Sequence, residues 1–118
     1  MKLGVKDGSR VLVTAAPDGF ELGAPHHVRA GGAPYDVVLL FAPDSASLRR
    51  RWPDALARTA VAGALWVAWP KKASGVRTDL TEDVIRDFAL PHGVVDVKVC
   101  AVDEVWSGLK LVRRLSNR

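Results

Sequence analysis

The chain has 118 residues, of which 48% are hydrophobic, and its 17 basic and 13 acidic side chains give a net charge of +4. This length and apolar content predict a single domain, residues 1–118, with a buried core. The modest excess of positive charge suits an anionic metabolite or an acidic protein partner, and its spread along the chain argues against nucleic acid as the partner.

Cys100 is the only cysteine, which excludes an intrachain disulfide and a site built from several cysteines. A lone cysteine fits a reducing compartment, and no apolar stretch reaches the length needed to span a bilayer. The first eight residues contain no apolar signal segment. We therefore expect a cytoplasmic protein that neither enters nor crosses a membrane.

Two apolar segments predict strands in the first third of the chain. Residues 10–16 are rich in β-branched side chains and lie between turns that contain glycine and proline. Residues 20–34 carry three glycines and two prolines, so we expect a loop there, with a short edge strand around Val28. Residues 35–42 are continuously hydrophobic, which is typical of a central parallel strand covered on both faces.

A helix is predicted after the second strand, with Asp44 or Ser45 as its N-cap. Its apolar positions recur at helical spacing and are Leu48, Trp52, Ala55 and Leu56. Pro53 leaves two alternatives, because either the helix kinks at the proline or a new helix begins there. Gly63 is expected to end this helical stretch.

The second half of the chain predicts a third strand, a second helix and a hairpin. Residues 64–69 form an apolar strand that Pro70 stops, and a loop follows at 71–80. Thr81 suits the N-cap of a helix with acidic residues in its first turn. Residues 94–102 and 109–112 are β-rich and are separated by a connection that contains glycine, which is a hairpin pattern.

Strands that alternate with helices and end in a hairpin favour an α/β domain. The expected fold is a small three-layer Rossmann-like domain with right-handed crossovers and a mostly parallel sheet that ends in an antiparallel hairpin.

The candidate site is the edge of this sheet where the strands end, because ligands of open α/β sheets bind in the crevice outside the carboxyl ends of the strands. Lys71, Lys72 and Ser74 follow the third strand, and Asp103 and Trp106 lie in the hairpin connection. Two ammonium groups can hold a phosphate or carboxylate, while Trp106 or Trp69 offers a flat surface for a ring. The competing interpretation is a solvated basic loop beside core tryptophans.

Several kinds of site are disfavoured. Ser74 has no neighbouring histidine, which argues against a serine hydrolase. Adjacent His26 and His27 point to opposite sides of an extended segment and have no further ligand at a familiar spacing, so no metal is expected. Residues 15–19 lack the glycines of a dinucleotide fingerprint. No catalytic residue and no cofactor is assigned, and whether the protein is an enzyme stays open.

From Tyr35 onward, the order of strand, helix, Gly-Ala-Leu-Trp-Val strand, helix and hairpin resembles the second half of class I S-adenosylmethionine-dependent methyltransferases. Residues 57–67 resemble that family's passage from helix to strand, in which a glycine turn precedes an apolar strand. The family's glycine-rich cofactor loop follows the first strand, where residues 15–19 depart from it.

A resemblance over nearly the whole chain is to a bacterial family known only as a domain of unknown function. Its marks are Leu3-Gly4 with Gly8, residues 36–40, Gly63-Ala64-Leu65-Trp66 running to Pro70-Lys71, and Trp106-Ser107-Gly108 before Leu111-Val112. This resemblance implies a small cytoplasmic α/β protein and brings no activity with it.

The first hypothesis is a small α/β module that binds an anionic metabolite or a protein partner at the edge with Lys71, Lys72 and Trp106. The alternative is a reduced methyltransferase-like enzyme. A third interpretation, nucleic-acid binding, rests on the arginines at 49–51, 113, 114 and 118. A homodimer through an unpaired sheet edge or an exposed aromatic surface near Trp52 is also compatible with the sequence.

Overall fold

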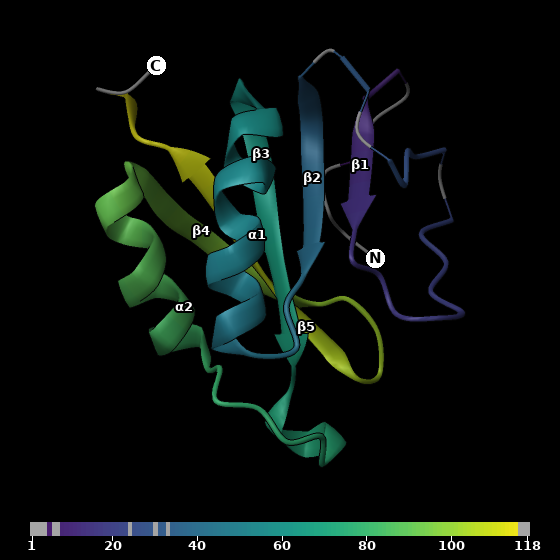
Figure 1. The fold of residues 1–118 in the computed structure, drawn as a ribbon, viewed down its shortest axis with the longest axis vertical. Helices are drawn as coiled ribbons and strands as arrows, with labels where there is room; N and C mark the ends of the chain where they lie inside the picture. Colours follow the sequence, from purple (N-terminus) through teal and green to yellow (C-terminus); the bar gives the residue numbers. More distant parts are fainter. Residues whose placement is uncertain (1–4, 6–7, 24, 30, 33, 116–118) are drawn as a thin grey trace.

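The computed structural model describes residues 5, 8–23, 25–29, 31–32 and 34–115, so the predictions for Leu3-Gly4 and Arg118 lie outside the described residues. Five strands form one mixed sheet in the order β1-β2-β3-β5-β4 (Figure 1). The strands are β1 (Val11–Thr14), β2 (Tyr35–Phe41), β3 (Thr59–Pro70), β4 (Val94–Ala101) and β5 (Trp106–Arg113). The helices are α1 (Ser45–Arg58) and α2 (Glu82–Ala89), with the 3₁₀ helices η1 (Lys72–Ser74) and η2 (Leu90–His92).

The strand pairing corrects the prediction of a mostly parallel sheet. β1 pairs with β2 and β2 with β3 in parallel, whereas β5 pairs antiparallel with both β3 and β4. The predicted terminal hairpin is confirmed, but its second strand returns between β3 and β4 instead of lengthening the sheet at its edge. Half of the strand pairings are therefore antiparallel.

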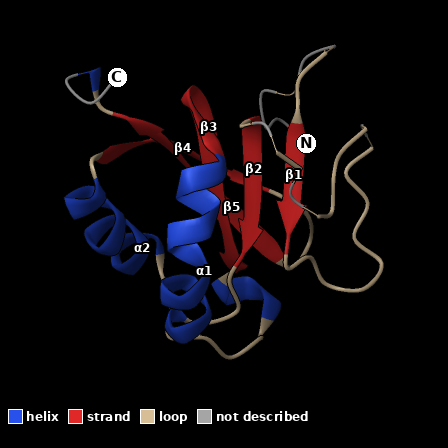
Figure 2. Cartoon of the chain, turned by 45° about the horizontal axis from the view of Figure 1, so that its top comes forward, coloured by secondary structure: helices blue, strands red, loops and turns tan. Residues whose placement is uncertain are grey.

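The three-layer Rossmann-like prediction is wrong, because α1 and α2 both cover the same face of the sheet (Figure 2). α1 connects β2 to β3 and α2 connects β3 to β4, so both crossovers advance in the same direction across the sheet. Right-handed crossovers that advance in one direction place their helices on one face. The described part of the connection between β1 and β2 contains no helix; its Phe20 and Leu22 pack against the opposite face.

The core has two halves, one on each face of the sheet. Val38 and Leu40 of β2 face the helices, while Leu39 and Phe41 face the loop side. All four side chains are fully buried. This explains the continuous hydrophobicity of residues 35–42 and confirms the prediction of a central strand between two parallel neighbours.

α1 is a single helix with Pro53 in its interior, so a new helix does not begin at the proline. The Asp44 side chain caps its first turn by accepting from the Ser47 amide at 2.8 Å. The helix ends at Arg58, five residues before the predicted stop at Gly63, and β3 starts at once with Thr59. Gly63 instead lies within β3, where a Cβ atom would sit 2.7 Å from the Asp36 carbonyl oxygen.

Arg113 of β5 adds hydrogen bonds at the end of α1, where Thr59 is the C-cap. Its guanidinium donates to the carbonyl oxygens of Leu56, Thr59 and Ala60 at 2.8–2.9 Å. Carbonyl groups at a helix C-terminus have no partner within the helix, and a cation there also opposes the helix dipole. The last strand of the sheet thus holds the end of the first helix.

α2 begins as predicted. The Thr81 hydroxyl accepts from the Val84 amide at 3.2 Å, and Glu82 and Asp83 occupy the first turn. Within the part of the chain that the structure describes, neither helix is long and apolar enough to cross a membrane.

The outer edge of β4 is protected against pairing with another strand. The register of β4 against β5 shifts between Asp96 and Lys98, and Lys98 is exposed. Bulges and lysines on an edge strand both oppose the addition of a further strand. Trp52 is only 1% exposed, so its own ring does not belong to an exposed aromatic surface.

Candidate functional site

A groove of about 1090 Å³ lies at the carboxyl end of β3, on the face that carries the helices. Trp69 and Pro70 from the end of β3 line its base. The loop 71–81 and the start of α2 form one wall, and Val99 of β4 and Ser107 of β5 contribute the other. The groove thus lies at the sheet edge where the sequence placed the candidate site.

Of the five predicted site residues, Lys71 and Lys72 line this groove. Ser74 has a local role instead: its hydroxyl donates to the Lys71 carbonyl oxygen at 2.6 Å and accepts from the Val76 amide at 3.2 Å. Gly75 follows with φ of 75°, a left-handed conformation that glycine adopts without strain. Ser74 and Gly75 together turn the chain so that the loop borders the groove.

Asp103 and Trp106 lie outside the groove. One carboxylate oxygen of Asp103 accepts from the amides of Val105 and Trp106 at 2.8 and 2.9 Å, which closes the turn between β4 and β5. The Trp106 ring packs edge-on against Phe41 with centroids 5.0 Å apart, on the face opposite the helices. The structure therefore does not bring these two side chains together with the lysines.

The groove also contains residues that the sequence analysis did not single out. Arg77 adds a third cation, and Val76, Val99 and Ser107 add apolar surface and a hydroxyl. Arg77 follows Lys72 in the same predicted loop, so the charge pattern of that loop was a usable signal. Val99 and Ser107 had none, because their place depends on the insertion of β5 beside β3.

The three cations of the groove are uncommitted. The side chains of Lys71, Lys72 and Arg77 form no hydrogen bond or ion pair with any residue that the structure describes. Lys71 is half-buried, and Lys72 and Arg77 are exposed. These three positive charges outnumber the two acidic residues of the same wall, Asp79 and Glu82, and favour a positive potential there.

The acidic residues of the groove are, in contrast, already engaged. Both carboxylate oxygens of Asp79 accept from Ser45, one from its amide at 2.8 Å and the other from its hydroxyl. These hydrogen bonds hold the pKa of Asp79 below its ordinary value of 3.8. Asp79 thereby ties the loop to the start of α1.

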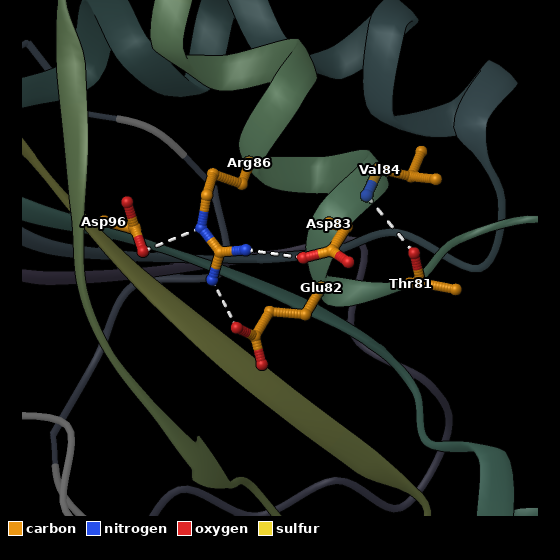
Figure 3. Close-up of polar contacts among 6 residues, drawn as sticks. All are labelled: Thr81, Glu82, Asp83, Val84, Arg86 and Asp96. Atoms are coloured by element: carbon orange, nitrogen blue, oxygen red, sulfur yellow. Dashed lines mark hydrogen bonds and ion pairs between the residues drawn. The ribbon is translucent and has the colours of Figure 1, made fainter.

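Glu82 is paired with Arg86, which also donates to Asp83 at 2.7 Å and to Asp96 of β4 at 2.8 Å (Figure 3). The hydrogen bond from Arg86 lowers the pKa of Asp96 below 3.8, and its bonds to Asp96 and Glu82 raise the pKa of Arg86 above its ordinary value. This cluster holds the first turns of α2 against the sheet. Glu82 therefore contributes structure to the groove rather than a free carboxylate.

Among the described residues, no three histidine, cysteine, aspartate or glutamate side chains come close enough together to hold a metal ion. His27 instead contacts Tyr35, with 3.2 Å between its Nδ1 atom and the tyrosine hydroxyl. Cys100 is half-buried against the core on the loop side of the sheet.

These observations define a small two-layer α/β protein with an open, cation-lined groove at the carboxyl edge of a mixed sheet. Comparison of the sequence with protein-family models and with curated proteins finds no match in either. The two resemblances described from the sequence accordingly stay predictions.

Proposed function

We propose that this protein is a cytoplasmic binding module that takes an anionic metabolite into the groove beside Lys71, Lys72 and Arg77. The observation that carries the proposal is the contrast within the groove: its three cations have no partner among the described residues, while its two acids are both engaged. An incoming anion would find free donors in that wall, whereas the carboxylates of Asp79 and Glu82 keep their charge but already have hydrogen-bond partners. An acidic segment of a protein partner is the competing ligand.

The alternative of a reduced methyltransferase-like enzyme has less support. Adenosylmethionine carries a sulfonium cation, which the uncommitted cations of the groove would repel. The chain after β1 also lacks a run of glycines, and Ala15 begins it with φ of 61°. Phe20, at the end of this segment, packs edge-on against Phe41 with ring centroids 4.8 Å apart. That contact gives residues 15–20 a packing role.

The test is isothermal titration of the purified protein with phosphate, pyrophosphate, citrate and adenosylmethionine, repeated on the double variant Lys71→Ala/Lys72→Ala. We expect at least one of the anions to bind, and we expect the variant to lose about tenfold or more in affinity. The melting temperature of the variant should stay close to that of the wild type, because neither ammonium group has an ion-pair partner among the described residues.

The double variant Arg50→Ala/Arg51→Ala is a matched control. It removes the same amount of charge from exposed positions on α1 that do not line the groove. Equal losses of affinity in the two variants would mean that anions bind only through net charge, and the proposal would then be wrong. Binding of adenosylmethionine in preference to the anions would favour the methyltransferase alternative.

A further inference from the structure

The groove also carries apolar surface beside its cations. Val76 of the cationic loop and Val99 of the opposite wall are 49% and 43% exposed, and they line the groove together with Trp69, Pro70 and Leu80. Exposed apolar surface that is gathered in a concave site marks a place where a partner is bound. A bare inorganic anion would satisfy the cations and leave this surface uncovered.

The cations also restrict the ligand. Three uncommitted cations lie within seven residues of one loop, at positions 71, 72 and 77. One carboxylate cannot neutralise them, whereas a chain of two or three phosphates carries several negative charges on oxygens that accept from lysine and, in pairs, from arginine. The half-buried Ser107 hydroxyl has no hydrogen-bond partner among the described residues and supplies a further donor.

The size of the groove agrees with such a ligand. Pockets for drug-sized molecules span roughly 300–1,000 Å³, and this groove encloses about 1090 Å³. A phosphate or pyrophosphate alone would fill a small part of that space. An organic body attached to the phosphates would occupy the remainder and cover the valines.

An extended acidic peptide fits less well. A peptide that lay across Val99 would continue along the outer edge of β4, where an extended chain gains affinity by adding a strand to the sheet. The register shift at Val97 and the exposed Lys98 oppose strand addition at that edge. A compact ligand confined to the groove avoids this obstacle.

We infer that the ligand is a nucleoside diphosphate or triphosphate, with its phosphates at Lys71, Lys72 and Arg77 and its base against Val76 and Val99. This inference rests on the proposed function and goes further, because it assigns separate roles to the cations and to the apolar surface of the groove. The phosphate chain contributes charge, and the base contributes the burial of apolar surface.

The experiment compares adenosine triphosphate, inorganic tripolyphosphate, adenosine and citrate by isothermal titration at one fixed salt concentration. We expect the nucleotide to bind at least about tenfold more tightly than tripolyphosphate or adenosine, because only the nucleotide contacts both the cations and the valines. The variant Val76→Ser/Val99→Ser should lose about fivefold or more for the nucleotide and be unchanged for tripolyphosphate. Lys71→Ala/Lys72→Ala should weaken both.

The control variant is Val61→Ser/Val97→Ser, which changes two exposed valines that do not line the groove and should leave all affinities unchanged. Equal affinity for nucleotide and tripolyphosphate, with no effect of Val76→Ser/Val99→Ser, would overturn the inference while anion binding stands. If citrate, or an oligoglutamate peptide added to the same titrations, binds more tightly than the nucleotide, the inference is overturned and the proposed function stands. If none of the anions binds, the inference and the proposed function both fail.

Discussion

Nε of Arg86 in α2 donates to Oδ2 of Asp96 in β4 at 2.8 Å, and among the described residues this is the one ion pair that joins a helix to the sheet. The same guanidinium holds Glu82 and Asp83 in the first turn of its own helix. The start of α2 belongs to the wall of the groove. One arginine therefore fixes that wall to the strand opposite it.

The first prediction concerns this pair. Asp96→Asn keeps the shape of the side chain and removes its charge, so we expect a lower melting temperature at pH 7. Because Arg86 lowers the pKa of Asp96 in the folded protein, the charged form contributes stability above about pH 4, and this contribution is lost as the pH falls through the folded pKa. Thermal unfolding should show a difference from the wild type that is constant near neutrality and shrinks in acid.

Asp87→Asn provides the control for that prediction, because it makes the same change at an exposed position of α2 with no ion pair to a described residue. If the difference in melting temperature between the wild type and Asp96→Asn grew as the pH fell, the stabilisation would not come from the ionised Asp96 carboxylate.

Gly63→Ala should destabilise the protein by about 1–3 kcal/mol, the usual range for overpacking. A Cβ atom there would lie 2.7 Å from the Asp36 carbonyl oxygen and 3.1 Å from those of Tyr35 and Ala60, and these backbone atoms cannot move aside as a side chain would. Unfolding in urea measures the change. Gly32→Ala should have little effect, since a Cβ at that position meets nothing within 4 Å.

Asp103→Ala should lower the stability by about 1 kcal/mol, because it removes the acceptor of two amide hydrogen bonds in the turn between β4 and β5. Ligand affinity should be unchanged, since this side chain does not line the groove. Asp103→Asn retains an acceptor and should recover most of the stability. If Asp103→Ala lost ligand affinity without losing stability, Asp103 would have to be counted among the ligand-binding residues.

Ala15→Gly should raise the stability by up to about 1 kcal/mol. Ala15 is the one non-glycine residue of the described chain with a positive φ, 61°, and that conformation costs an L-residue about 1–2 kcal/mol. The greater freedom of glycine in the unfolded chain offsets part of this gain. Ala16→Gly, at a neighbour without a positive φ, should instead lower the urea midpoint.

Local signals were enough to predict several elements from the sequence. β2 follows from a hydrophobic run that is buried on both faces, and α2 follows from the Thr81 cap and the acidic first turn. The end of α1 was misplaced at Gly63, although its C-cap is local: Thr59 donates its amide to the Leu56 carbonyl oxygen and its hydroxyl to that of Ala55. The additional bond from Arg113, 55 residues beyond Arg58 in the chain, leaves no local pattern.

Half of the groove depended on one non-local choice, which is where β5 pairs. Lys71 and Lys72 were found because a strand that ends in Pro70 delivers them to the sheet edge. Val99 and Ser107 join them only through the insertion of β5 beside β3. The same register places Trp106 opposite Pro70 and against Phe41, away from the lysines.

The position of β5 also bears on synthesis of the chain. When residues 1–101 have emerged from the ribosome, β4 still lacks its neighbour, because β4 pairs with β5 and makes no pairing with β3. Until residue 113 emerges, the nascent protein keeps an open edge on β3 and has no guanidinium to close α1. The groove is thus the last part to be completed, and a chain that stops a few residues early is expected to meet the chaperones and proteases of the cell as an unfinished sheet.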